Sequence, residues 1–257
     1  MGCTYPSLVA DFSRVDGRRP VTLETIGRRL KTAGLVATGG LYAAPATMRV
    51  TDAANLLIGA NAARSAVKAP EAVARFRAFR SWQTSRAGSE TKLPGEISEA
   101  ETFGAALEAM IATAPVIKES FLDFARQAFP RHLPGFHSRM AFSPLAVVAL
   151  EVEFVRGAYE AAFIRVVTRL AEKREVALEI AFHPADGEAL PSEGVDRVVT
   201  SCVGLETIRV LHAAITGRPL PGPAAGPAPW GEGASGDAPG GASRRARMGD
   251  AERVLDA

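Results

Sequence analysis

Cysteine is scarce in this chain of 257 residues, because only Cys3 and Cys202 occur, too few for a disulfide framework. Aromatic side chains make up only 7% of the residues, which predicts a core built mainly from small and aliphatic side chains. No apolar run approaches the ~18 residues of a membrane span. Residues 1–20 also lack the charged and apolar regions of a secretory signal. These absences predict a cytoplasmic protein with no membrane partner.

Motifs of the common enzyme classes are also missing. The chain contains no G-x-S-x-G, H-E-x-x-H, Walker A or Rossmann glycine pattern, so we predict no enzyme activity, no cofactor and no small-molecule ligand. His132 and His137 lie five residues apart with no cysteine nearby, a spacing that does not predict a metal site. Glu151 and Glu153 share one side of an expected strand and could hold Mg²⁺ in a nuclease, but such a pair more commonly marks a solvated sheet face.

Charge is divided unevenly along the chain. Residues 1–86 hold 13 Lys and Arg against 5 Asp and Glu, whereas residues 87–216 hold 12 against 18. Residues 217–257 hold 5 of each sign, so the net charge of +2 conceals a basic N-terminal third and an acidic middle. A basic block of this size favours a polyanionic partner, most simply nucleic acid. The acidic middle is a second available partner for it, within one chain or between copies in a homo-oligomer.

Seven cations of the basic third are the candidate phosphate contacts. Guanidiniums alternate with aromatic rings from Arg75 to Trp82, a pattern that suits phosphate pairing and base stacking. The aromatic spacing of three also fits the buried side of an amphipathic helix, and Glu24 stands four residues before Arg28, as in a local ion pair. The predicted nucleic-acid-binding residues are Arg28, Arg29, Lys31, Arg49, Arg75, Arg77 and Arg80.

Apolar spacing predicts helices over most of the N-terminal half. Residues 1–20 show little pattern and are expected to form an arm. Three helices should follow, after N-caps at Thr22 and Thr51 and a first-turn Pro70, at residues 22–33, 52–67 and 70–82. A helix, a glycine-marked loop and a capped helix are compatible with a helix-turn-helix unit, although the loop is longer than in the standard motif.

A linker over residues 84–96 should lead to a helical connector. Ser98 and Glu101 have the spacing of a capping box, which predicts a helix start at this point. A second connector helix should follow Pro115, and four Pro and Gly residues predict a loop over residues 130–144.

The pattern changes to strand-like alternation after Pro144. Val148 to Phe154 and Val176 to Phe182 alternate between apolar and other side chains, and residues 196–201 suggest a further short strand. Residues 158–173 fit either a helix or the middle strand of an antiparallel meander, and their β-branched side chains favour the meander. A closing helix should carry Leu205, Ile208, Leu211 and Ile215 and end at Gly217.

We therefore predict an α+β fold in three parts. Residues 1–86 should form a basic helical region, and residues 97–216 an α+β domain with a small antiparallel sheet and a closing helix. Residues 217–257 contain 9 Gly and 6 Pro with few large apolar side chains, so they should be disordered.

The stretch from Thr22 to Ala60, TLETIGRRLKTAGLVATGGLYAAPATMRVTDAANLLIGA, resembles segments of uncharacterised proteins encoded by phages and prophages. The resemblance implies a mobile-element setting, where small DNA-binding regulators and packaging adaptors are common, and it assigns no functional residue. Together with the charge split, it predicts a non-enzymatic nucleic-acid-binding protein, with DNA the favoured partner. The alternative is a protein-interaction or structural module in which the basic and acidic regions pair with each other.

Overall fold

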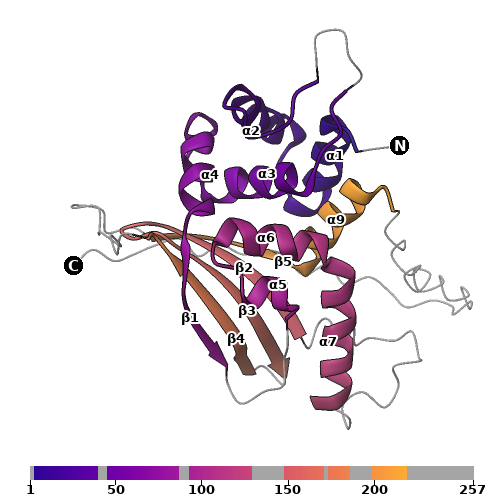
Figure 1. Ribbon diagram of the computed structural model, residues 1–257, viewed down its shortest axis with the longest axis vertical. Helices are drawn as coiled ribbons and strands as arrows, with labels where there is room; N and C mark the ends of the chain where they lie inside the picture. Colours follow the sequence, from indigo (N-terminus) through magenta and orange to yellow (C-terminus); the bar gives the residue numbers. More distant parts are fainter. Residues whose placement is uncertain are drawn as a thin grey trace, which may run out of the picture. The chain divides into compact units, whose positions relative to one another are not determined.

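Helices and an antiparallel sheet make up the protein. The computed structural model describes residues 3–39, 45–86, 93–128, 148–170, 173–185 and 198–218, all within one compact unit, Met1–Leu220. The elements are α1 (Tyr5–Asp16), α2 (Pro20–Thr32), α3 (Val50–Ala62), η1 (Ala66–Lys68), α4 (Ala69–Arg77), β1 (Arg80–Arg86), α5 (Gly95–Ser98), α6 (Phe103–Ala112), α7 (Ala114–Ala128), β2 (Val148–Gly157), β3 (Ala161–Leu170), β4 (Lys173–His183), β5 (Val198–Gly204) and α9 (Leu205–Thr216) (Figure 1). The predicted α+β class is confirmed.

The five strands form one sheet in the order β1-β4-β3-β2-β5, and every neighbouring pair is antiparallel. β2, β3 and β4 are the predicted meander, so residues 161–170 are a strand rather than a helix. Val152, Ile164 and Ile180 stand side by side across it and are fully buried. The alternation of β2 and β4 in the sequence thus marked the face that the helices cover.

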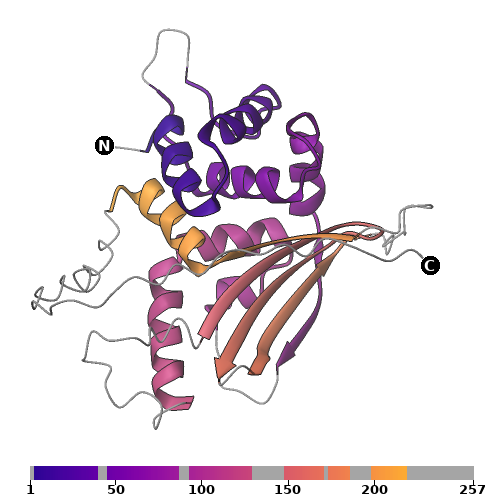
Figure 2. The ribbon, with the colours of Figure 1, turned by 180° about the vertical axis from the view of Figure 1, so that it is seen from behind.

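The described helices lie on one face of the sheet, and Figure 2 shows the other face, on which no described helix lies. Phe103 of α6 packs against Phe154 of β2 and Phe182 of β4, with ring centroids 5.5 Å and 5.4 Å apart. Phe76 of α4 lies 6.2 Å from the Phe154 ring. A fully buried Phe contributes roughly 1.5–3 kcal/mol to folding, so this cluster is a large part of the core. Residues of both predicted regions, 1–86 and 97–216, belong to that core.

The expected arm over residues 1–20 is wrong, since Tyr5–Asp16 form helix α1. Leu8 and Phe12, four residues apart, are fully buried. α1 packs against α2 and against α9 at the opposite end of the described chain. Gly17 ends the helix in the left-handed conformation, with φ 78°. The apolar surface that stabilises α1 therefore comes from a distant helix, which local pattern does not reveal.

The expected helix over residues 70–82 ends early, at Arg77, and Arg80–Arg86 form the edge strand β1. Its partner is the edge of β4, where Ser81 stands opposite Phe182. Phe76 and Phe79 are buried as the spacing predicted, but Trp82 is 73% exposed. Pairing with β4 satisfies backbone groups that a frayed helix end would leave to water, and this tertiary contact outweighs the helical spacing.

Three further boundaries differ from expectation. α6 begins at Phe103 rather than after Ser98, and the hydroxyl of Thr102 caps it by accepting from the Ala105 N–H at 3.2 Å. α3 ends at Ala62 rather than at residue 67, and β1 and α5 occupy the ends of the expected linker. The predicted loop over 130–144 and the predicted tail beyond Arg218 lie outside the described residues. Gly217 ends α9 as predicted, with φ 66°.

Among the described residues, no helix combines the length and apolar character that spanning a bilayer requires.

Candidate functional site

Three of the predicted phosphate contacts form ion pairs with the acidic middle of the same chain. Arg75 NH2 lies 2.8 Å from Glu160 Oε1, and Arg75 also pairs with Glu71 on its own helix. The other two pairs join Arg77 NH2 to Glu108 Oε1 at 2.5 Å, and Arg80 NH1 to Glu101 Oε2 at 3.2 Å.

The Arg77–Glu108 and Arg80–Glu101 pairs differ in their exposure to solvent. The side chains of Arg77 and Glu108 are each 29% exposed, whereas those of Arg80 and Glu101 are 57% and 85% exposed. Arg77 also donates from NH1 to the Oδ1 of buried Asn55 at 2.9 Å. Arg77 is therefore held in place at the junction of α3, α4 and α6. The exposed Arg80–Glu101 pair contributes little to stability.

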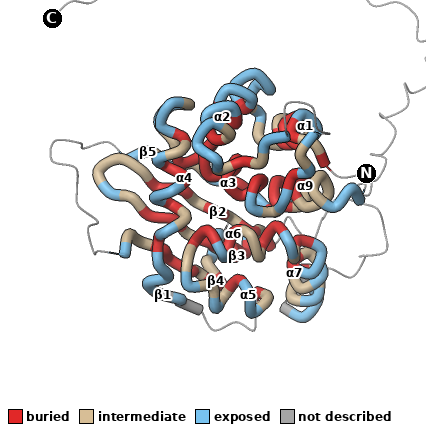
Figure 3. Tube along the Cα trace, turned by 45° about the horizontal axis from the view of Figure 1, so that its top comes forward, coloured by how far each residue is buried: buried red, intermediate tan, exposed pale blue. Residues whose placement is uncertain are grey.

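Four other predicted contacts lie on α2 or just before α3. Arg28, Arg29 and Arg49 are exposed, and within the described ranges no carboxylate forms an ion pair with any of them. The expected Glu24–Arg28 ion pair is likewise not formed. Figure 3 shows that much of α2 is exposed. We call Arg28, Arg29 and Arg49 the open arginines.

Lys31 has a different environment from the open arginines. Its Nζ lies 3.4 Å from the ring centroid of Tyr5, and burial lowers the pKa of its ammonium group. The Tyr5 hydroxyl in turn donates to the carbonyl of Leu23 at 3.1 Å. Lys31 is thus partly engaged in joining α1 to α2.

The burial of α3 prevents it from recognising bases in the major groove of DNA. Every residue of α3 from Asp52 to Ala62 is buried, and Gly59 lies in contact range of Ile26 and Leu30 of α2. A recognition helix must present one face to the major groove. α3 has no such face, so the second helix of the expected helix-turn-helix is a core helix here.

Asn61, near the C-terminal end of α3, connects three parts of the chain. Its Oδ1 accepts from Arg18 NH2 at 3.2 Å and from the Ser201 hydroxyl at 2.6 Å, and its Nδ2 donates to the Leu57 carbonyl at 2.9 Å. The side chain is only 2% exposed and all its polar atoms are used. It is the satisfied structural residue that a buried asparagine usually is.

Two arginines are bonded near the end of α3 that carries this asparagine. Arg18, after α1, donates to Asn61, and Arg156 of β2 donates from NH1 to the carbonyl of Ala63. A third, Arg64, follows Ala63 directly in the chain. We call these three the guanidinium cluster. Sequence reasoning missed it, because only the fold joins its members.

One carboxylate accompanies the cluster in the described structure. Asp16 Oδ1 pairs with Arg18 NH1 at 2.6 Å, and the Asp16 side chain is 3% exposed. Its other oxygen, Oδ2, is buried and has no hydrogen-bond partner among the described residues.

Glu151 and Glu153, the carboxylates considered for Mg²⁺ binding, form ion pairs with arginines across the sheet, and Glu179 shares one of these arginines. Glu153 and Glu179 both pair with Arg165 of β3, and Glu151 pairs with Arg169 and Arg174. Burial raises the pKa of Glu151, but hydrogen bonds from the two arginines outweigh that effect and hold it below its usual value. This arrangement is a cross-strand ladder of ion pairs, which stabilises a sheet. The described residues contain no group of three metal-ligating side chains, and His132 and His137 lie outside them.

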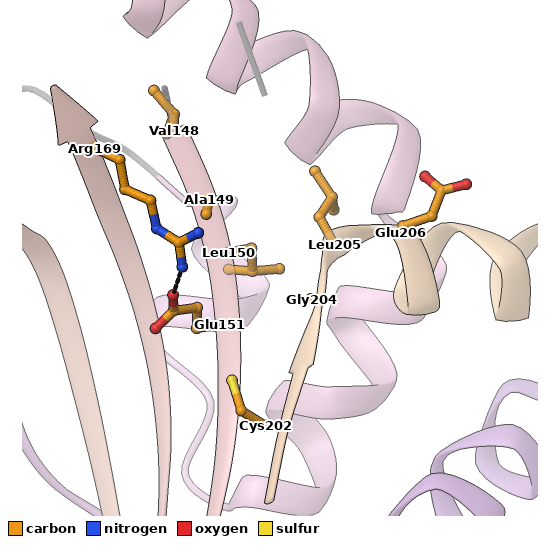
Figure 4. Close-up of a pocket in the computed structure, with 9 residues that line it drawn as sticks. All are labelled: Val148, Ala149, Leu150, Glu151, Arg169, Cys202, Gly204, Leu205 and Glu206. Atoms are coloured by element: carbon orange, nitrogen blue, oxygen red, sulfur yellow. Dashed lines mark hydrogen bonds and ion pairs between the residues drawn. The ribbon is translucent and has the colours of Figure 1, made fainter. Parts of the chain in front are cut away.

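A pocket of about 410 Å³ opens beside this ladder, between β2, β5 and the start of α9 (Figure 4). Its polar lining includes Glu151, Arg169 and Cys202, and the figure shows Arg169 bonded to Glu151 rather than facing an empty space. The residue Cys202 is exposed, but its thiol is shielded from water and lies near Glu151, and both effects raise its pKa. A raised pKa disfavours the thiolate, so the thiol is a poor nucleophile.

No protein-family model, curated protein or solved structure matches the chain.

Proposed function

We propose that this protein binds nucleic acid without catalysing a reaction, with duplex DNA the favoured partner. The observation that supports the proposal is that the open arginines Arg28, Arg29 and Arg49 are exposed and have no carboxylate partner in the described structure. Lys31 adds a fourth positive charge on the same helix as two of them. Exposed guanidiniums of this kind pair with backbone phosphates and fix a protein on a duplex without reading its sequence.

The proposal keeps only four of the seven predicted phosphate contacts. Arg75, Arg77 and Arg80 already have carboxylate partners, so binding phosphate would require breaking those pairs. The burial of α3 favours phosphate contacts over base readout. The proposed setting is the cytoplasm, where the two free cysteines stay reduced, and the phage resemblance suits a regulator or packaging adaptor.

The test is the salt dependence of duplex binding by the full chain, followed by fluorescence anisotropy. Each phosphate neutralised contributes a slope of about −0.9 to log K against log[salt], so three to four contacts give a slope of roughly −3 to −4. Changing Arg28, Arg29 and Arg49 to Gln removes three of these contacts, so the remaining slope should be no steeper than about −1, the share of Lys31.

Arg14→Gln is the matched control, because Arg14 is equally exposed but pairs with Asp11 on its own helix. It should leave the slope unchanged. Absence of duplex binding at about 50 mM salt, where phosphate contacts are strong, would refute the proposal.

A second candidate function has its own observation. Three pairs, Arg75–Glu160, Arg77–Glu108 and Arg80–Glu101, join the basic third to the acidic middle within one chain, which supports the structural-module alternative. Changing the three arginines to Glu should then lower stability or dissociate a homo-oligomer. If the triple variant keeps its stability and oligomeric state and loses only nucleic-acid affinity, this alternative fails.

A further inference from the structure

The guanidinium cluster gathers more positive charge than its surroundings compensate. Arg18, Arg64 and Arg156 carry three positive charges, and in the described part of the chain only Asp16 forms an ion pair with one of them. The carbonyl end of α3 supplies the equivalent of about −0.5 charge. Roughly +1.5 of charge therefore remains without a partner at this place.

Capping of the C-terminal end of α3 explains why one arginine lies there, but it does not explain why there are three. Arg156 donates to the Ala63 carbonyl just after α3, and a single cation is enough to satisfy such a helix end. Burial and then the positive charges of Arg18 and Arg64 lower the pKa of Arg156, because like charges disfavour its protonated form. A bound anion would relieve this repulsion.

The cluster also keeps hydrogen-bond donors available. A guanidinium has five N–H donors, of which Arg156 uses one and Arg18 uses two in the bonds described above. Arg64 is exposed and makes no hydrogen bond within the described ranges. Two guanidiniums are thus anchored by α3 and Asp16, and the N–H groups of the Arg64 guanidinium have no partner in the described ranges.

We propose that Arg18, Arg64 and Arg156 form a binding site for one phosphate group. Guanidinium forks match the oxygens of a phosphate, and charge-assisted bonds of this type are the stronger class of hydrogen bond. The phosphate can belong to a small ligand or to a nucleic-acid backbone. The site consists of residues other than the open arginines, so it does not depend on the proposed function.

Calorimetric titration of the full chain with inorganic phosphate, at an ionic strength held constant with sodium chloride, tests the site. The informative variant is Arg64→Gln, because this exposed side chain supports no other described contact and its loss should leave the fold intact. We expect it to weaken phosphate binding by about tenfold or more, as for one charge-assisted hydrogen bond. Arg14→Gln, at an exposed arginine with a local carboxylate, should bind phosphate like the wild type.

Two results would overturn the site. One is no binding by the wild type up to about 10 mM phosphate, where even a Kd of ~1 mM gives nearly full occupancy. The other is equal affinity in the wild type and Arg64→Gln when circular dichroism shows both to be folded.

Competition with duplex DNA identifies the source of the phosphate. If DNA displaces phosphate and Arg64→Gln also weakens DNA binding, the cluster takes a backbone phosphate. If DNA leaves phosphate binding unchanged, the ligand is a free phosphate or a phosphate ester. The Arg28, Arg29 and Arg49 triple variant should keep its phosphate affinity, so failure of the nucleic-acid proposal is distinguishable from failure of this site.

Discussion

Replacing Arg77 by Met separates a structural arginine from a nucleic-acid contact. Methionine retains an aliphatic stem against Gly104, where a Cβ would lie 3.1 Å from the Arg77 Cβ, and removes only the guanidinium. Two acceptors lose their donor: the carboxylate of Glu108, whose side chain is 29% exposed, and the Oδ1 of Asn55, a residue that is 3% exposed.

The expected cost follows from the burial of these two partners. A partly exposed ion pair is worth up to about 1 kcal/mol. A buried acceptor left without a donor costs about 1–3 kcal/mol, because water cannot replace the lost hydrogen bond. We therefore expect Arg77→Met to lower the free energy of unfolding by roughly 2–4 kcal/mol. For a unit of this size, each kcal/mol lowers Tm by about 2–4 °C.

Urea unfolding followed by circular dichroism measures this loss, with Arg80→Met as the matched control. The Arg80–Glu101 pair is far more exposed, so its removal should cost no more than about 1 kcal/mol. DNA affinity should remain unchanged in both variants. An unchanged unfolding midpoint for Arg77→Met, or a loss of DNA affinity as large as that of the Arg28, Arg29 and Arg49 variant, would refute the structural role of Arg77.

Three further predictions concern α1, α2 and the pocket. Gly27→Ala should destabilise the protein by at least about 3 kcal/mol in urea unfolding, because the new Cβ would overlap the Tyr5 ring, and adding Tyr5→Ala should recover part of the loss. Burial raises the pKa of Tyr5 to about 12, so the stability that its protonated hydroxyl provides is complete below pH ~10 and is lost as the pH rises through the folded pKa. Tyr5→Phe should therefore show a shallower loss of stability between those values than the wild type. Cys202 should react with iodoacetamide more slowly than a free thiol at the same pH, and Glu151→Gln should raise that rate, since the Glu151 charge is one cause of the raised pKa.

Local pattern was enough to predict the sheet meander and several helices. Val148 to Phe154 alternate along β2, and the same alternation in β4 gave the buried face correctly, because the side-chain period of a strand is fixed by its backbone. Helix α9 could be predicted equally well, since its buried residues follow the helical period and Gly217 ends it. These features depend on neighbours within a few residues.

Other features depended on partners that sequence order does not indicate. β1 is a strand because the edge of β4 is available to pair with it, and α1 is a helix of the core because α9 covers it. Each was misread from local spacing alone, since stability came from surface that a distant segment supplies.

Composition and local pattern are enough to predict the charge split between residues 1–86 and 87–216 and the α+β class. Which charges meet depends on the folded chain. It pairs Arg77 with Glu108, leaves Arg28, Arg29 and Arg49 exposed, and brings Arg18 and Arg156 to the end of α3 that Arg64 follows. The physical reason is that an ion pair acts over a few ångströms of space, and the chain's topology sets which residues come that close.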